Sequence, residues 1–193
     1  MFLIFGQMII CFSLILMQPS FGSKDVGKQD MFDIDGCSEG WYITGYFTPM
    51  ESDYRGPTQT IQIKPEAQSE ERSFVKSFLD EVYIEGWGKT LRGDYIHPDP
   101  SDNKWYSAPI AKDALDDRLV KGKTVAVDTE LIEFGIKLNI PSLISPWNSF
   151  TYIAMDIGGS IKGKNIDIYT GEGKNAKEET FKITGDDGVI CKL

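Results

Sequence analysis

The stretch Asp156-Ile157-Gly158-Gly159-Ser160-Ile161-Lys162-Gly163-Lys164-Asn165-Ile166-Asp167 carries an aspartate at each end of a glycine-rich turn. In residues 152–157 the large apolar side chains share one face of a strand, which leaves Asp156 on the other face. In residues 165–169 the isoleucines again share a face, and Asp167 points the opposite way. Because glycine permits sharp turns, the segment between them predicts two short strands that return both carboxylates to one neighbourhood.

A third aspartate, Asp128, ends a strand-like run that begins at Thr124. Together, Val-Ala-Val-Asp (125–128), Ala-Met-Asp-Ile-Gly-Gly-Ser-Ile-Lys-Gly (154–163) and Asn-Ile-Asp-Ile-Tyr (165–169) resemble the three-aspartate (3D) domain of the membrane-bound lytic murein transglycosylase A family. The resemblance implies a mainly β fold, a six-stranded double-psi β-barrel with one or two peripheral helices. It also implies cleavage of peptidoglycan glycan strands.

The same resemblance assigns a role to each aspartate. Cleavage of a glycosidic bond needs an acid that keeps its proton near neutral pH, and a second nearby carboxylate or burial makes this feasible. Asp167 is expected to act as the general acid and then as the base, with Asp156 raising its proton affinity and Asp128 supporting the pair or binding sugar. A lytic transglycosylase needs no second catalytic carboxylate, because the 6-hydroxyl of muramic acid attacks intramolecularly to give a 1,6-anhydro product.

Other residues are candidates for substrate binding. Gly158 and Gly159 are expected to turn backbone N–H groups toward the glycan, with Lys162 near its lactyl or acetamido oxygens. Tyr46, in a segment similar to the start of the family's barrel, either lines the sugar groove or fills the core. Trp87, between two glycines, is either a platform for a sugar ring or half-buried packing.

Competing functions are weaker or of a different class. The only histidine, His97, falls in a proline-rich segment where we expect it to be solvated, which argues against Ser-His-Asp and Cys-His mechanisms. The aspartates lack the ligand spacing of a calcium loop, and we expect neither a metal site nor a cofactor. We expect the chain to lack the large second domain of the full-length family, so a non-catalytic, expansin-like polysaccharide-binding or wall-loosening protein is the alternative.

Length, composition and charge limit the number of domains and the class of partner. The 193 residues, with 41% hydrophobic and 12% aromatic content, predict one 3D-type barrel domain over residues 37–193. The formal net charge of −9 argues against nucleic acid, which is bound through clusters of lysine and arginine. The expected partner is peptidoglycan, and the sequence leaves the oligomeric state open.

The N-terminal segment predicts export. Residues 1–22 combine an uncharged apolar run with a small-x-small pattern and read as a signal peptide, with a retained membrane anchor as the alternative. Residues 23–36 are expected to form a flexible arm. After cleavage we expect no stable membrane span and a secreted or periplasmic protein.

Two cysteines, Cys37 and Cys191, remain after removal of that segment, near the two ends of the domain. In an oxidising compartment they predict a disulfide that closes nearly the whole domain, and two unpaired buried thiols are the alternative.

The remaining chain predicts further strands and one helix. Strands are expected at 41–48, where the barrel begins, and at 58–63 and 83–90. A helix is expected from its cap at Ser69 to about Val82. A charged loop at 171–179 and closing strands at 181–183 and 189–191 complete the predicted domain.

Overall fold

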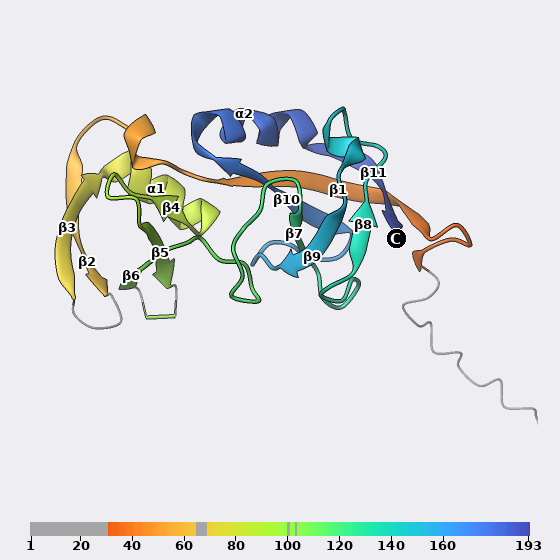
Figure 1. Ribbon diagram of the computed structural model, residues 1–193, viewed down its shortest axis with the longest axis horizontal. Helices are drawn as coiled ribbons and strands as arrows, with labels where there is room; N and C mark the ends of the chain where they lie inside the picture. Colours follow the sequence, from red (N-terminus) through yellow and green to blue (C-terminus); the bar gives the residue numbers. More distant parts are fainter. Residues whose placement is uncertain (1–30, 65–68, 100, 103) are drawn as a thin grey trace, which may run out of the picture.

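The structure is a computed structural model that describes residues 31–64, 69–99, 101–102 and 104–193. The predicted signal peptide and residues 23–30 of the predicted arm lie outside the described residues. The described chain forms two lobes, a closed β-barrel and a smaller sheet, which lie side by side along the long axis of the molecule (Figure 1). No helix in this described part is long and apolar enough to cross a membrane.

The barrel has six strands: β1 (Cys37–Thr48), β7 (Thr124–Val127), β8 (Lys137–Asn139), β9 (Tyr152–Asp156), β10 (Asn165–Glu172) and β11 (Gly185–Lys192). Around the barrel their order is β1-β10-β7-β9-β8-β11. The pairs β1/β10 and β7/β9 are parallel, and the other four are antiparallel. The mainly β fold and closed six-stranded barrel expected from the sequence are confirmed, and the mixed pairing is compatible with a double-psi barrel.

Alternating apolar side chains fill the barrel. Val125, Ile166 and Ile168 are fully buried, on the faces that strand alternation predicts. Burial of a side chain of this size contributes about 1.5–3 kcal/mol to folding. Strand β10, which carries Asp167, is therefore fixed by the core on one face, which leaves its other face for polar side chains. In β9 the core side chains are Tyr152 and Ala154, so the expectation that residues 153, 155 and 157 form the apolar face was wrong.

Helix α2 (Gly173–Ile183) lies along β1 and β10 on the outside of the barrel (Figure 1). The prediction of a charged loop followed by a strand was wrong here. Ala176, Thr180 and Ile183 are buried at helical spacing, while most of the charged residues between them are exposed. The sequence pattern was weak because only one of the three buried side chains is large and apolar.

The second lobe was not anticipated from the sequence. Its strands are β2 (Thr58–Lys64), β3 (Glu70–Val75), β4 (Gly88–Lys89), β5 (Tyr95–Asp99) and β6 (Lys104–Ala108). They form one sheet in the order β3-β2-β6-β5-β4. Helix α1 (Lys76–Glu85) buries Phe78 and Val82 against Ile63 and Phe74, which gives this lobe a core of its own. The chain enters the lobe from β1 and returns to the barrel at β7.

The helix predicted from Ser69 begins later than expected. Residues 70–75 are strand β3, in which Arg72 and Phe74 are buried and alternate with exposed residues. This period of two fits the antiparallel register with β2, and it was hidden by two glutamates that look like the first turn of a helix.

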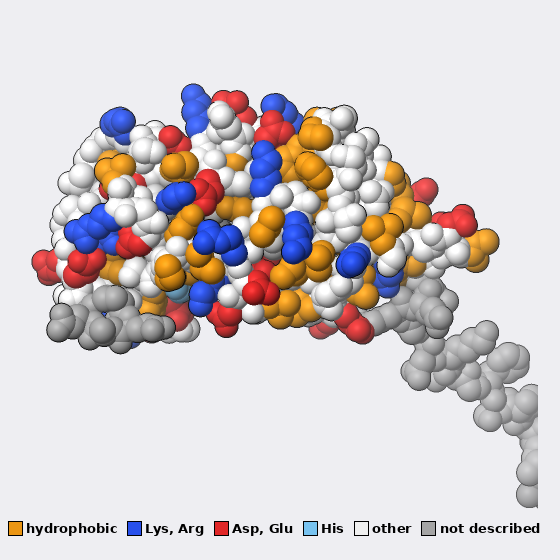
Figure 2. Space-filling model, in the orientation of Figure 1, with side chains coloured by type: hydrophobic (Ala, Val, Ile, Leu, Met, Phe, Trp, Pro, Cys, Tyr) orange, Lys and Arg blue, Asp and Glu red, His pale blue; other side chains and the backbone are white. Residues whose placement is uncertain are grey.

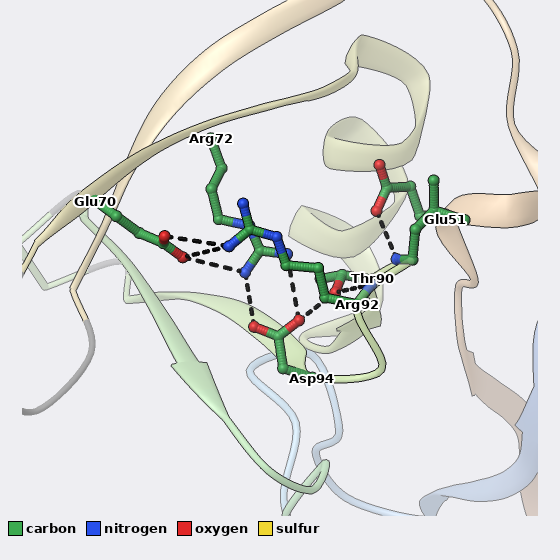
Figure 3. Close-up of polar contacts among 7 residues, drawn as sticks. Glu51, Glu70, Arg72, Thr90, Arg92 and Asp94 are labelled. Carbon is green, nitrogen blue, oxygen red and sulfur yellow. Dashed lines mark hydrogen bonds and ion pairs between the residues drawn. The ribbon is translucent and has the colours of Figure 1, made fainter.

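A polar network fixes β3 to the rest of the second lobe (Figure 3). The buried guanidinium of Arg72 donates two hydrogen bonds to Asp94, at 2.6 and 3.2 Å. Glu70 pairs with Arg92 at 3.2 Å, and Thr90 donates a hydrogen bond to Asp94. Because a buried arginine is costly without a partner, Asp94 is essential to this arrangement. The network includes none of the three aspartates of the sequence motif.

A disulfide joins Cys37 of β1 to Cys191 of β11, as expected from the cysteine count. The two residues are direct partners in the antiparallel β1/β11 pair. The bond therefore connects the two ends of the domain across adjacent strands of the barrel.

Candidate active site

Strand register brings Asp156 and Asp167 together. Asp156 ends β9 and Asp167 lies in β10, and both strands pair with β7 between them. Ala126 of β7 is the partner of Asp156 on one side and of Asp167 on the other. Because paired residues on neighbouring strands project to the same face of a sheet, both carboxyl groups lie on the face of Ala126. A register shift between β7 and β9 just before Ala126 brings Asp156, rather than Met155, opposite it.

The carboxylate of Asp156 is held by two donors. The Tyr46 hydroxyl donates to Oδ2 at 2.6 Å, and the Ile157 backbone N–H donates to Oδ1 at 2.9 Å. Burial raises the pKa of Asp156 above its usual value and outweighs these hydrogen bonds, and the charge of Asp113 acts in the same direction. Burial and the Asp156 charge raise the pKa of Tyr46 in turn, so its hydroxyl stays a donor.

Asp167 also holds its proton more tightly than a free aspartate, because its pKa is raised. The Thr44 hydroxyl, from the facing position on β1, donates to its Oδ1 at 2.8 Å. Burial raises the pKa of Asp167 to about 6, the Thr44 hydrogen bond lowers it, and the negative charge of Asp156 raises it further. A carboxyl group of this kind keeps its proton in mildly acidic solution and can also lose it, as acid and base catalysis requires.

Asp128 has a different environment. It is 7% exposed, and its two oxygens accept hydrogen bonds from the Glu130 N–H at 3.0 Å and the Gly163 N–H at 2.8 Å. The amide of Gly163, followed by that of Glu130, lowers the pKa of Asp128, so it is ionised at neutral pH. Gly163 has a φ of 65°, in the left-handed region that favours glycine. Asp128 therefore fastens the loop between the other two aspartates.

A groove between the two lobes contains Asp156 and Asp167. One section, of about 510 Å³, is lined by both aspartates and Tyr46 from the barrel and by residues 83–87 from the second lobe. An adjoining section of about 740 Å³ shares Asp156 but lies nearer β5 and β6. Figure 2 shows hydrophobic, basic and acidic side chains next to one another over the middle of the molecule, where the lobes meet. The lining of the groove combines aromatic, basic and acidic side chains, which suits a polar ligand better than a small apolar one.

Residues 123–185 match the family model of the 3D domain. The chain contains a 3D domain. The matched region includes all three aspartates, and the resemblance drawn from the sequence motifs is confirmed.

Solved structures extend the likeness beyond the 3D domain. MltA from Escherichia coli with bound chitohexaose has a TM-score of 0.59 at 17% identity, covering 80% of this chain and 72% of that chain. MltA from Neisseria gonorrhoeae gives 0.53 at 14% identity, covering 80% and 73%. A membrane-bound lytic murein transglycosylase from Agrobacterium tumefaciens gives 0.52 at 17% identity, covering 79% and 73%. None of the curated protein sequences matches significantly. At these identities the likeness establishes a shared fold.

Two aromatic candidates line the groove beside the 3D domain. Tyr46 packs its ring against Tyr169 at 5.2 Å and faces the groove as well as Asp156. Trp87 is partly buried and lines both sections of the groove, with its ring centroid 4.3 Å from that of His97. His97 lies in β5 and also stacks on Tyr106, and burial lowers its pKa. The expectation of a solvated loop histidine was therefore wrong.

The turn of the 3D domain contributes glycines to the groove. Gly158 and Gly159 both line the section that holds the aspartates, and Gly159 has open space where a side chain would project. Lys162 is exposed, and its positive charge acts on Asp128. The lysine that lines both sections of the groove is Lys112, in the segment between β6 and β7, which sequence reasoning did not single out.

Sequence reasoning also missed Glu85. The predicted strand at 83–90 is wrong over its first three residues, which end helix α1, and only β4 remains of it. When residue 85 is read as part of a strand, nothing in the sequence indicates a functional role for it. At the end of α1, however, Glu85 lines the groove and accepts a hydrogen bond from the barrel. Among the described residues, no group of three or more His, Cys, Asp and Glu side chains is placed to hold a metal ion.

Proposed function

We propose that the protein is a peptidoglycan lytic transglycosylase that cleaves the β-1,4 bond between MurNAc and GlcNAc. The observation that carries this proposal is Asp167, a buried carboxyl group with a pKa raised to about 6, in a groove between two lobes. The 3D domain and the fold shared with lytic transglycosylases support the same class of activity.

In this proposal Asp167 acts twice. Its proton passes to the glycosidic oxygen as the bond from that oxygen to C1 of MurNAc breaks. The resulting carboxylate then takes the proton of the MurNAc 6-hydroxyl, whose oxygen bonds to C1 and closes the 1,6-anhydro ring. The proton returns to Asp167 and no water is consumed, so one acid/base suffices.

The neighbouring residues supply charge and orientation. Asp156 raises the proton affinity of Asp167, and its own carboxylate is fixed by Tyr46 and Ile157. A fixed negative charge also stabilises the positive charge that develops at C1 in the transition state. Trp87 offers part of an indole face to the sugars, and Gly158 and Gly159 let the backbone approach them.

The proposal includes export to the periplasm or cell exterior. The disulfide between Cys37 and Cys191 is typical of oxidising compartments. Residues 1–22 read as a signal peptide. N-terminal sequencing of the protein from its native compartment should find a chain that starts at about residue 23, and a retained N-terminus would instead indicate an anchor.

Mass spectrometry of the products released from purified peptidoglycan tests the function. We expect muropeptides that end in 1,6-anhydromuramic acid, absent with Asp167→Asn and present with Asp186→Asn, a matched control at an exposed aspartate of β11. Products with reducing ends would mean hydrolysis by a second carboxylate. Binding to sacculi without any release, unchanged by Asp167→Asn, would support the expansin-like alternative.

A further inference from the structure

A carboxyl group that this mechanism does not use lies in the groove beside Asp167. Glu85 is the last residue of α1 and lines the same section of the groove as Asp156 and Asp167. It belongs to the second lobe, whereas both aspartates belong to the barrel. The helix dipole opposes a negative charge at the C-terminal end of a helix, so helix stability does not explain a glutamate here.

The Glu85 side chain is anchored to the barrel. Its Oε2 accepts a hydrogen bond of 3.1 Å from the N–H of Phe47, the residue after Tyr46 in β1. One turn earlier in α1, Glu81 pairs with Lys177 of α2 at 2.6 Å, and the Lys177 ammonium also lies over the Phe47 ring. The end of α1 is thus tied to the barrel at two points, which holds the Glu85 carboxyl in place.

Glu85 and Asp167 interact electrostatically. Burial raises the pKa of Glu85 to about 7, the Phe47 amide lowers it, and the negative charge of Asp167 raises it. Glu81 on the same helix acts in the raising direction, and Lys177 of α2 in the lowering one. Because coupling between two titrating groups is mutual, an ionised Glu85 must also favour the protonated form of Asp167.

We propose that Glu85 is a positioning residue through which the second lobe keeps a proton on the general acid Asp167. This inference rests on the proposed function. As the pH rises, the pair of carboxyl groups loses its two protons in two steps. After the first step the remaining proton is shared between Glu85 and Asp167, so Asp167 is protonated in a larger fraction of molecules than it would be without Glu85. The second lobe thereby extends the activity of the barrel's acid toward neutral pH.

The test compares wild type with Glu85→Gln, whose amide oxygen still accepts the Phe47 hydrogen bond. We expect the alkaline limb of kcat/KM to move down by about half a pH unit, which is about a threefold loss at pH 7.5 and little change at pH 5. Glu71→Gln, at an exposed residue of β3, is the matched control and should leave the profile unchanged. A loss that is equal at every pH would show a merely structural role and overturn the inference.

Carboxyl carbon NMR gives a second readout that does not need turnover. The Asp167 signal, identified by its loss in Asp167→Asn, should titrate at a lower pH in Glu85→Gln than in wild type. In Asp167→Asn the Glu85 signal should also titrate at a lower pH, which tests the coupling even where Glu85→Gln fails to fold. If wild type releases no anhydro product, the proposed function fails. If wild type is active and neither titration moves, the role of Glu85 alone is overturned.

Discussion

Replacing Asp167 with asparagine should stabilise the protein at neutral pH while abolishing its activity. The pKa of Asp167 is raised from 3.8 to about 6, so the folded state holds its proton more tightly than the unfolded state. At 1.36 kcal/mol per pH unit, ionising this group costs the folded state about 3 kcal/mol. Below about pH 4 the carboxyl is neutral in both states and the cost is absent, and above about pH 6 the cost is complete.

Asparagine keeps the Oδ1 acceptor for the Thr44 hydroxyl but carries no charge at any pH. We therefore expect the variant to gain up to about 3 kcal/mol over wild type at pH 7.5 and close to nothing at pH 4. Loss of the Asp167 charge also eases ionisation of Glu85, which acts in the same direction.

Urea unfolding of the oxidised protein at the two pH values measures this difference, provided that the slopes with denaturant agree. The comparison between pH values cancels any constant effect of the substitution. Asp186→Asn, at an exposed site, should show no such dependence. If Asp167→Asn changes the unfolding free energy equally at both pH values, or destabilises the protein more at pH 7.5, Asp167 is not a desolvated acid and the catalytic argument loses its basis.

Further predictions concern the supporting contacts. Tyr46→Phe removes the hydroxyl that donates to Asp156, and kcat/KM for anhydromuropeptide release should fall by about tenfold, since a hydrogen bond to a charged group is worth about 1.5 kcal/mol or more. Asp128→Asn should lower the melting temperature at pH 7, and the difference should shrink as the pH falls through the lowered pKa of Asp128, because its contribution exists only while it is ionised. Replacing Cys37 and Cys191 with alanine should cost about 5 kcal/mol in the unfolding free energy, for a sequence separation of 154 residues. Unchanged values in any of these measurements would contradict the corresponding assignment.

The sequence predicted the part of the site that depends on strand parity. Asp167 interrupts an alternating apolar pattern, and for β10 alternation is enough to place its side chain away from Ile166 and Ile168. For Asp156 the expected alternation was wrong, because the core side chains of β9 are Tyr152 and Ala154, and a register shift against β7 sets the position of Asp156. The disulfide followed from two cysteines near the ends of a single domain. The hydrogen bonds of Tyr46 and Thr44 to these aspartates were not predictable, because they depend on the parallel register of β1 with β10, which no local pattern specifies.

Elements outside the barrel were harder to predict because their patterns are ambiguous. Two glutamates before Arg72 look like a helix start, yet Arg72 is buried in a strand through its pairing with Asp94 across the lobe. Glu85 was overlooked for the same reason, since its significance depends on where α1 ends. In both cases the local structure depends on residues that are distant in the sequence, and the sequence alone does not identify those residues.

The second lobe changes what the barrel can do. A separate apolar cluster lies between the lobes, with Tyr95 from β5 and Tyr169 from β10 at its centre. Glu172 of β10 reinforces the junction by accepting hydrogen bonds from Tyr95 at 2.6 Å and from Lys89 of β4 at 2.6 Å.

Burial is the largest cause of the raised pKa of Asp167, and residues 83–87 of the second lobe form one wall of its groove. The end of α1 and the loop after it therefore supply a wall that the barrel alone does not have. A barrel with three aspartates but no such wall would leave Asp167 more hydrated, with a pKa nearer its usual value and less of the acid form near neutral pH. The raised pKa of Asp167 thus depends on the junction between the lobes and not on the barrel alone.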